Sequence, residues 1–154
     1  MIMDERNEFA DANSVAAAAG TALIGDVIDL GAVHRGLGNG QPVWLVITTD
    51  TRIITGGGAG TVKFQLASDS TADLATSPTT HLDTGTFVTG AASASPLTVG
   101  GTIACIALPL EGPVYERYLG ILCVTATTTT IAGKINAFLT LDPTGWQTYA
   151  EGVN

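Results

Sequence analysis

The chain has 154 residues, enough to bury a hydrophobic core without help from metals or disulfides. Hydrophobic residues make up 45% of it and charged residues only 13%, which excludes extensive disorder and leaves much of the surface uncharged, as in self-associating proteins. The 14 acidic and 6 basic residues give a formal net charge of −8, which excludes direct binding to a nucleic-acid backbone.

Residues 1–30 are predicted to form an extended N-terminal arm. Four acidic residues precede Ala12, and the Ala-rich stretch before Gly20 is too short for a helix that stands alone. A short strand is expected at Val27–Leu30. Acidic residues stand where a secretory signal would carry positive charge, so we expect synthesis in a host cytoplasm. Contacts with a neighbouring subunit or a shell are expected from Asp4, Arg6, Phe9, Val15, Leu23 and Ile28.

Residues 31–154 are predicted to form a single antiparallel β-sandwich. Short β-prone runs alternate with clusters of Gly, Pro, Ser, Asp and Asn, as in all-β domains. In Thr61–Ala67, apolar and polar residues alternate, which predicts one buried and one solvated face. The nearly continuous apolar runs are expected to be strands covered on both faces, with Trp44 and Tyr118 in the core. They are Pro42–Thr49, Thr102–Leu108 and Arg117–Thr127.

The last strong run is Lys134–Asp142, where Ile135, Ala137, Leu139 and Leu141 are expected to share one face. A weak edge strand is expected around Thr79–Leu82, which brings the predicted number of strands to seven or eight. No apolar run reaches the roughly 20 residues of a membrane-spanning helix.

The residues that could take part in catalysis or bind a metal form no recognisable catalytic, metal or cofactor site. His34 and His81 are isolated from each other and from any metal-binding motif. The Gly56–Gly60 stretch lacks the Lys and the following helix of a phosphate-binding loop. Cys105 and Cys123 lie in apolar runs, which favours two buried thiols over a disulfide. We therefore expect that the protein is not an enzyme and needs no cofactor.

Two aromatic residues near the C-terminus leave an alternative open. Trp146 and Tyr149 could stack on sugars, as in a carbohydrate-binding or receptor-binding module of a virion. Aromatic residues near a terminus more often attach that terminus to a neighbour, so we include both among the expected subunit or capsid contacts.

Three stretches in the same order resemble the jelly-roll capsid cement, or decoration, proteins of tailed bacteriophages. They are Val27–Asp50 with its Gly-rich bend, Thr61–Phe87 with its Asp-rich turn, and Arg117–Pro143 with its closing hairpin. The sequence departs from this pattern at Leu74, where the family would place an aromatic residue.

The resemblance implies a function without catalysis. It implies a jelly-roll homotrimer on the outer surface of the virion, bound between capsomers of a major capsid protein. Such a role needs contact area rather than reactive groups, and symmetric copies multiply modest contacts.

Overall fold

The computed structural model describes residues 5–32, 37, 41–57, 60–90 and 95–146. Its regular structure consists of β-strands and two short 3-10 helices. The strands are β1 (Glu8–Ser14), β2 (Gly20–Asp29), β3 (Trp44–Thr55), β4 (Gly60–Asp69), β5 (Thr79–Asp83), β6 (Phe87–Thr89), β7 (Thr102–Ala107), β8 (Tyr118–Ala126) and β9 (Thr130–Thr140). The 3-10 helices are η1 (Glu5–Asn7) and η3 (Pro143–Trp146). Within these ranges there is no helix of the length and hydrophobicity needed to cross a bilayer.

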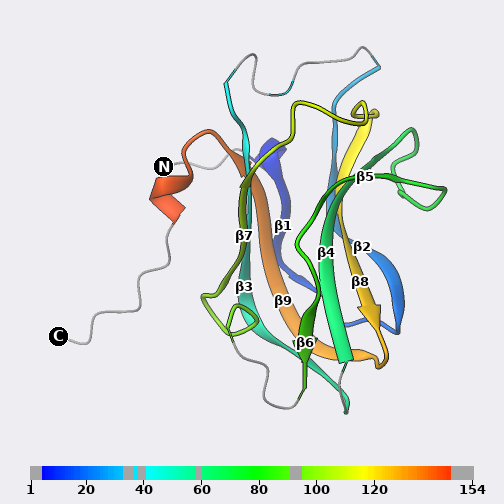
Figure 1. Cartoon of the computed structure of the whole chain (residues 1–154), viewed down its shortest axis with the longest axis vertical. Helices are drawn as coiled ribbons and strands as arrows, with labels where there is room; N and C mark the ends of the chain where they lie inside the picture. The colour runs from blue at the N-terminus through cyan, green and yellow to red at the C-terminus, as the bar shows by residue number, and fades with distance from the viewer. Residues whose placement is uncertain (1–4, 33–36, 38–40, 58–59, 91–94, 147–154) are drawn as a thin grey trace.

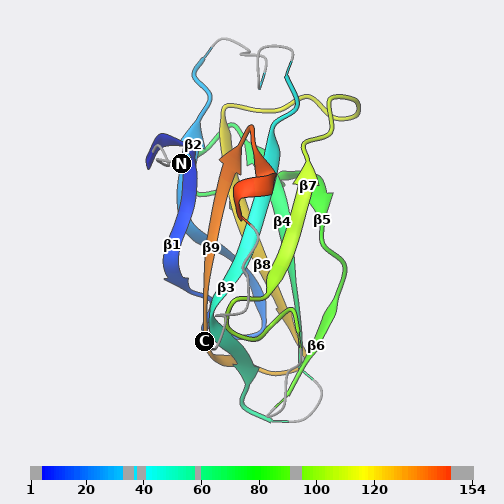
Figure 2. The same ribbon diagram turned by 90° about the vertical axis from the view of Figure 1, so that its left-hand side faces the viewer.

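The strands form two antiparallel sheets that pack face to face (Figures 1 and 2). One sheet has the order β1-β9-β3-β7, and the other has the order β2-β8-β4-β5, with β6 also paired to β4. The pairs are nested along the chain: β1 pairs with β9, β2 with β8, β3 with β7, and β4 with β5 and β6. A long antiparallel hairpin folded over itself in this way is a jelly roll, so the predicted all-β antiparallel sandwich is confirmed.

The N-terminal segment is not an arm, which corrects the prediction for residues 8–29. β1 is hydrogen-bonded along β9 in one sheet, and β2 is hydrogen-bonded along β8 in the other. Phe9, Val15 and Ile24 from this segment are buried in the main core. The segment is therefore part of the sandwich, because its backbone and apolar side chains find partners in strands that follow much later in the chain.

The main core lies between the two sheets and follows the predicted alternation. Val62, Phe64 and Leu66 of β4 are fully buried, as predicted for one face of that strand. On β9 the predicted inward face is confirmed for three of its four residues, all of which lie in the core. The fourth, Leu141, follows the end of β9 and is exposed, which corrects the prediction for that residue.

The first sheet is also buried on its outer side. Val46 on β3 lies opposite Phe138 on β9, and both are buried although neither belongs to the core between the sheets. Helix η3 lies on this outer side (Figures 1 and 2). The prediction of strands covered on both faces is thus confirmed for β3. It is wrong for β7, where Cys105 and Ile106 are exposed. Trp44 is only partly buried instead of being a core residue.

The second sheet carries a smaller hydrophobic cluster on its outer face. Leu74, from the β4–β5 connection, packs with Ala67 and Leu122. Gly120 leaves room for it, since a Cβ at that position would lie 3.3 Å from a Leu74 methyl carbon. Tyr118 borders this cluster and is partly buried, so the prediction that it is a core residue is wrong as well.

Candidate interaction surfaces

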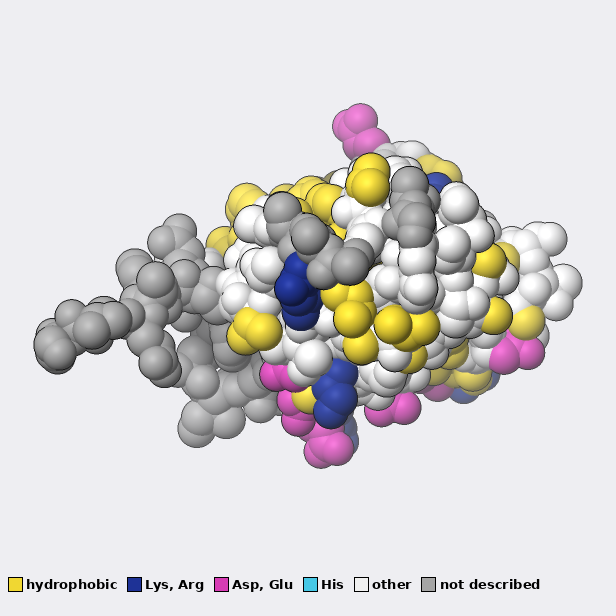
Figure 3. Space-filling view, turned by 90° about the horizontal axis from the view of Figure 1, so that it is seen from below, with side chains coloured by type: hydrophobic (Ala, Val, Ile, Leu, Met, Phe, Trp, Pro, Cys, Tyr) yellow, Lys and Arg dark blue, Asp and Glu magenta, His cyan; other side chains and the backbone are white. Residues whose placement is uncertain are grey.

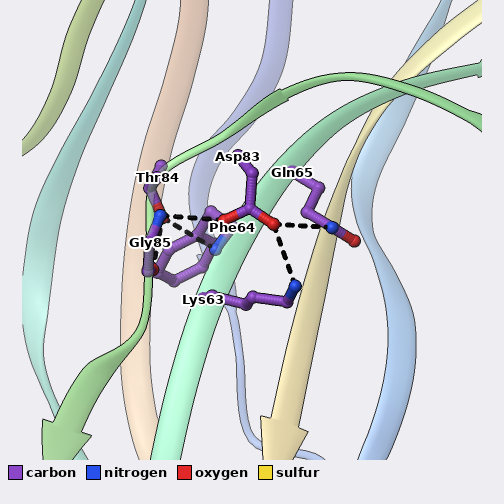
Figure 4. Close-up of polar contacts among 6 residues, drawn as sticks. All are labelled: Lys63, Phe64, Gln65, Asp83, Thr84 and Gly85. Atoms are coloured by element: carbon purple, nitrogen blue, oxygen red, sulfur yellow. Dashed lines mark hydrogen bonds and ion pairs between the residues drawn. The ribbon is translucent and has the colours of Figure 1, made fainter.

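A polar cluster holds the exposed edge of the second sheet. One carboxylate oxygen of Asp83 accepts hydrogen bonds from Lys63 Nζ and from Gln65 Nε2, each at 2.9 Å (Figure 4). The pKa of Asp83 is lowered, mainly by the hydrogen bond from Lys63. Burial acts in the opposite direction, and the hydrogen bonds from Gly85 and Gln65 lower the pKa further. The ion pair is partly exposed to solvent, so its net contribution to stability is small.

The turn after β5 is fixed by the same cluster. The other carboxylate oxygen of Asp83 accepts the N–H of Gly85 at 2.8 Å. Thr84 makes two bonds to Phe64: its N–H donates to the carbonyl oxygen at 3.0 Å, and its hydroxyl accepts the N–H at 3.1 Å (Figure 4). These polar side chains join β5 to β4, which favours a structural role for them.

A second cluster attaches the β7–β8 connection to the same sheet edge. Ser68 Oγ lies 2.7 Å from His81 Nε2 and accepts the N–H of Glu116 at 2.9 Å. The His81 ring stacks on Tyr115 with 3.9 Å between the centroids. Thr79 donates its hydroxyl to the Glu116 carboxylate at 3.1 Å. Burial lowers the pKa of His81, and the negative charge of Glu116 opposes that shift.

The Ser68–His81 contact has the residue types of a nucleophile and its base, but its surroundings are structural. The Ser68 side chain is completely buried, so no substrate can reach its hydroxyl. Its oxygen already accepts a backbone N–H. Among the described residues, no group of three or more His, Cys, Asp or Glu side chains could hold a metal ion. His34 lies outside the described residues.

The two cysteines differ in their surroundings. Both are free thiols. Cys123 is buried in the main core, and this burial raises the pKa of its thiol to about 11, so it is unreactive. Cys105 is exposed on β7, the outermost strand of the first sheet, which corrects the prediction of two buried thiols.

Large apolar side chains are exposed near both ends of the sandwich. Leu110 and Val114 lie in the β7–β8 connection, which the Ser68–His81 cluster holds in place. Near the opposite end, Val88 lies on β6 and Ile131 near the start of β9. Sequence periodicity could not reveal these residues, since single apolar residues in Gly-, Pro- and Thr-rich stretches do not indicate a buried face.

The predicted contact residues do not form one surface. Arg6 is exposed in η1, Leu23 and Ile28 are partly buried on β2, and Phe9 and Val15 are fully buried. The buried pair cannot touch a partner of the folded chain, which corrects that part of the prediction. The remaining predictions fall outside what the structure describes: Asp4, Tyr149 and the side chain of Trp146.

Comparison with protein families gives a match that covers most of the chain. The Bbp16 family matches residues 9–139, which is nearly the whole span from β1 to β9. The chain belongs to the Bbp16 family. Membership in Bbp16 is consistent with a phage protein. A search of curated proteins gives no match.

Proposed function

We propose that this Bbp16 protein is a capsid cement, or decoration, protein of a bacteriophage. It acts as a homotrimer on the outer surface of the head, binds the major capsid protein between capsomers and catalyses no reaction. One observation carries the proposal: the Bbp16 match, over residues 9–139, covers nearly all of the jelly roll, which extends from Glu8 to Thr140. The fold is the one expected of the cement proteins that the sequence resembles.

The chemistry of the surface supports a role based on contact. The conspicuous polar side chains, such as Asp83, His81 and Ser68, bind other parts of the same chain. The side chains left exposed include large apolar ones such as Leu110 and Val114. Apolar side chains at the centre of a contact, with polar groups around them, are typical of protein interfaces.

The test is binding to phage heads that lack the protein. Purified protein is mixed with such heads, the heads are sedimented, and the bound protein is measured together with the temperature at which the heads open. We expect saturable binding and heads that open at a higher temperature. Light scattering should give three times the 15.7 kDa mass of the chain for the free protein. No binding to heads of the cognate phage would contradict the proposal.

A further inference from the structure

We infer that the middle of the β7–β8 connection, residues 109–116, is a latch that neutral His81 holds closed and that protonation of His81 opens. The connection crosses from the first sheet to the second at one end of the sandwich (Figure 1). We call residues 109–116 the latch. The inference concerns the folded chain itself and does not depend on the proposed function.

The two ends of the latch are fixed by backbone hydrogen bonds, but its middle is not. Leu108 donates its N–H to the Val43 carbonyl at 2.8 Å, and Leu30 donates its N–H to the Arg117 carbonyl at 2.7 Å. Between these points, the latch makes no backbone–backbone hydrogen bond with any residue that the structure describes. Two of its residues are prolines, which have no N–H to donate. The latch can therefore move without breaking a strand pairing.

Side-chain contacts hold the latch against the second sheet. The ring of Tyr115 stacks on His81 of β5, with 3.9 Å between the centroids and 20° between the planes, and it also packs against the main core. The Tyr115 hydroxyl donates to the Pro109 carbonyl at 3.0 Å, which joins the two ends of the latch to each other. Next to Tyr115, Glu116 donates its N–H to Ser68 Oγ of β4 at 2.9 Å. His81 and Ser68 are thus the points of the sheet on which the latch closes.

The Ser68 hydroxyl selects the protonation state of His81 that fits the closed latch. Ser68 is completely buried, so its hydroxyl hydrogen needs an acceptor within the protein. Its oxygen already accepts the N–H of Glu116, and His81 Nε2 lies 2.7 Å away as the acceptor, which assigns the hydrogen of the neutral ring to Nδ1. A protonated ring carries a hydrogen on Nε2 and can no longer accept. The buried hydroxyl then loses its partner, which destabilises the closed latch.

The other groups around His81 leave this effect in place. β4 contributes the uncharged Ser68, and the latch contributes Tyr115 and Glu116. Burial raises the pKa of Tyr115 to about 12, so its hydroxyl stays neutral. Burial lowers the pKa of His81 and outweighs the opposing negative charge of Glu116. Asp83, on the same strand as His81, is engaged in an ion pair.

Opening the latch relieves both costs of protonation. It takes the Tyr115 ring off the imidazole and lets water reach His81 and Ser68, so that proton binding and opening favour each other. Leu110 and Val114 belong to the latch and are highly exposed, so acidification rearranges the apolar surface at this end. The view onto the opposite end shows Lys and Arg side chains near its middle and no His among the described residues (Figure 3). The histidine switch therefore belongs to the latch end.

The experiment measures hydrogen exchange of the Glu116 amide by NMR in the full chain, at about pH 7.5 and about pH 5. Each rate is corrected for the intrinsic pH dependence of exchange and expressed as a protection factor. We expect the wild-type protection to fall by roughly threefold or more at the lower pH, with the amides of β9 unchanged. His81→Gln can still accept the Ser68 hydroxyl but does not titrate, so it should show no fall. Thr79→Val removes a different contact of the latch, the bond to the Glu116 carboxylate, and should keep the fall.

Three results would overturn the inference: wild-type protection of the Glu116 amide that is independent of pH, an equal fall in His81→Gln, or a fall shared by β9. In the last case the whole molecule opens rather than the latch. If circular dichroism shows that His81→Gln does not fold, the wild type alone decides. The shift of the His81 ring protons and the protection of Glu116 must then change with the same midpoint, and different midpoints overturn the inference. Binding to phage heads is measured separately, so a failure of the proposed function leaves this test unaffected.

Discussion

Gly25 on β2 adopts a backbone conformation that other residues rarely adopt. Its φ is +67°, and a Cβ there would collide with the carbonyl oxygen of Phe9 on β1. We predict that Gly25→Ala lowers the free energy of unfolding by at least ~2 kcal/mol, from left-handed backbone strain and this clash. Gly57→Ala is the control, since a Cβ there meets open space. The urea midpoints of the two variants should differ clearly, and equal midpoints would contradict the prediction.

The partly buried imidazole of His81 makes stability depend on pH. Burial lowers its pKa below the ordinary value of 6.5, despite the nearby Glu116 carboxylate. Above pH 6.5 both the folded and the unfolded chain hold a neutral His81, and its contribution to stability is complete. As pH falls below 6.5, the unfolded chain binds the proton more readily, so stability decreases until the pH passes the lowered pKa of the folded state.

The prediction for His81 is measured as the urea midpoint between pH 7.5 and pH 5. The midpoint of the wild type should fall over this range. The His81→Gln variant should lose much of this dependence, because its side chain does not titrate while other groups are unchanged. A variant as sensitive to pH as the wild type would exclude His81 as the cause.

At the scale of elements, the first two strands are necessary for the sandwich. Deleting residues 1–26 removes β1 and most of β2, with the buried side chains of Phe9, Val15 and Ile24. We predict that the truncated chain lacks a cooperative unfolding transition, because both sheets lose an outer strand and the core loses large side chains. Deleting residues 1–7 spares every strand and should preserve cooperative unfolding. Calorimetry of both truncations provides the test, and a cooperative transition after the longer deletion would restore the idea of an arm.

At the scale of the whole molecule, the charge of the chain opposes its assembly. Fourteen acidic residues against six basic ones repel between copies, and salt screens this repulsion. Because this repulsion weakens as salt is added, raising the salt concentration should favour the proposed oligomer. Sedimentation analysis from ~0.02 to ~0.5 M NaCl should show the dissociation constant falling. Dissociation by salt would instead indicate a contact made by ion pairs.

The sequence by itself determined the β-sandwich and its strongest strands. In β4 the alternation of Val62, Phe64 and Leu66 with polar residues can place only one face in a core, whatever the partners are. The Gly- and Pro-rich connections could also be predicted from the sequence, because Gly and Pro have distinctive backbone preferences.

Only the tertiary structure decided the role of the N-terminal segment. β1 (EFADANS) has few strongly β-prone residues, so the prediction of an arm failed there, and its strand forms because β9 supplies hydrogen-bond partners. The pairing of β1 with β9 and of β2 with β8 joins strands far apart in the chain, and local composition carries no information about such pairing.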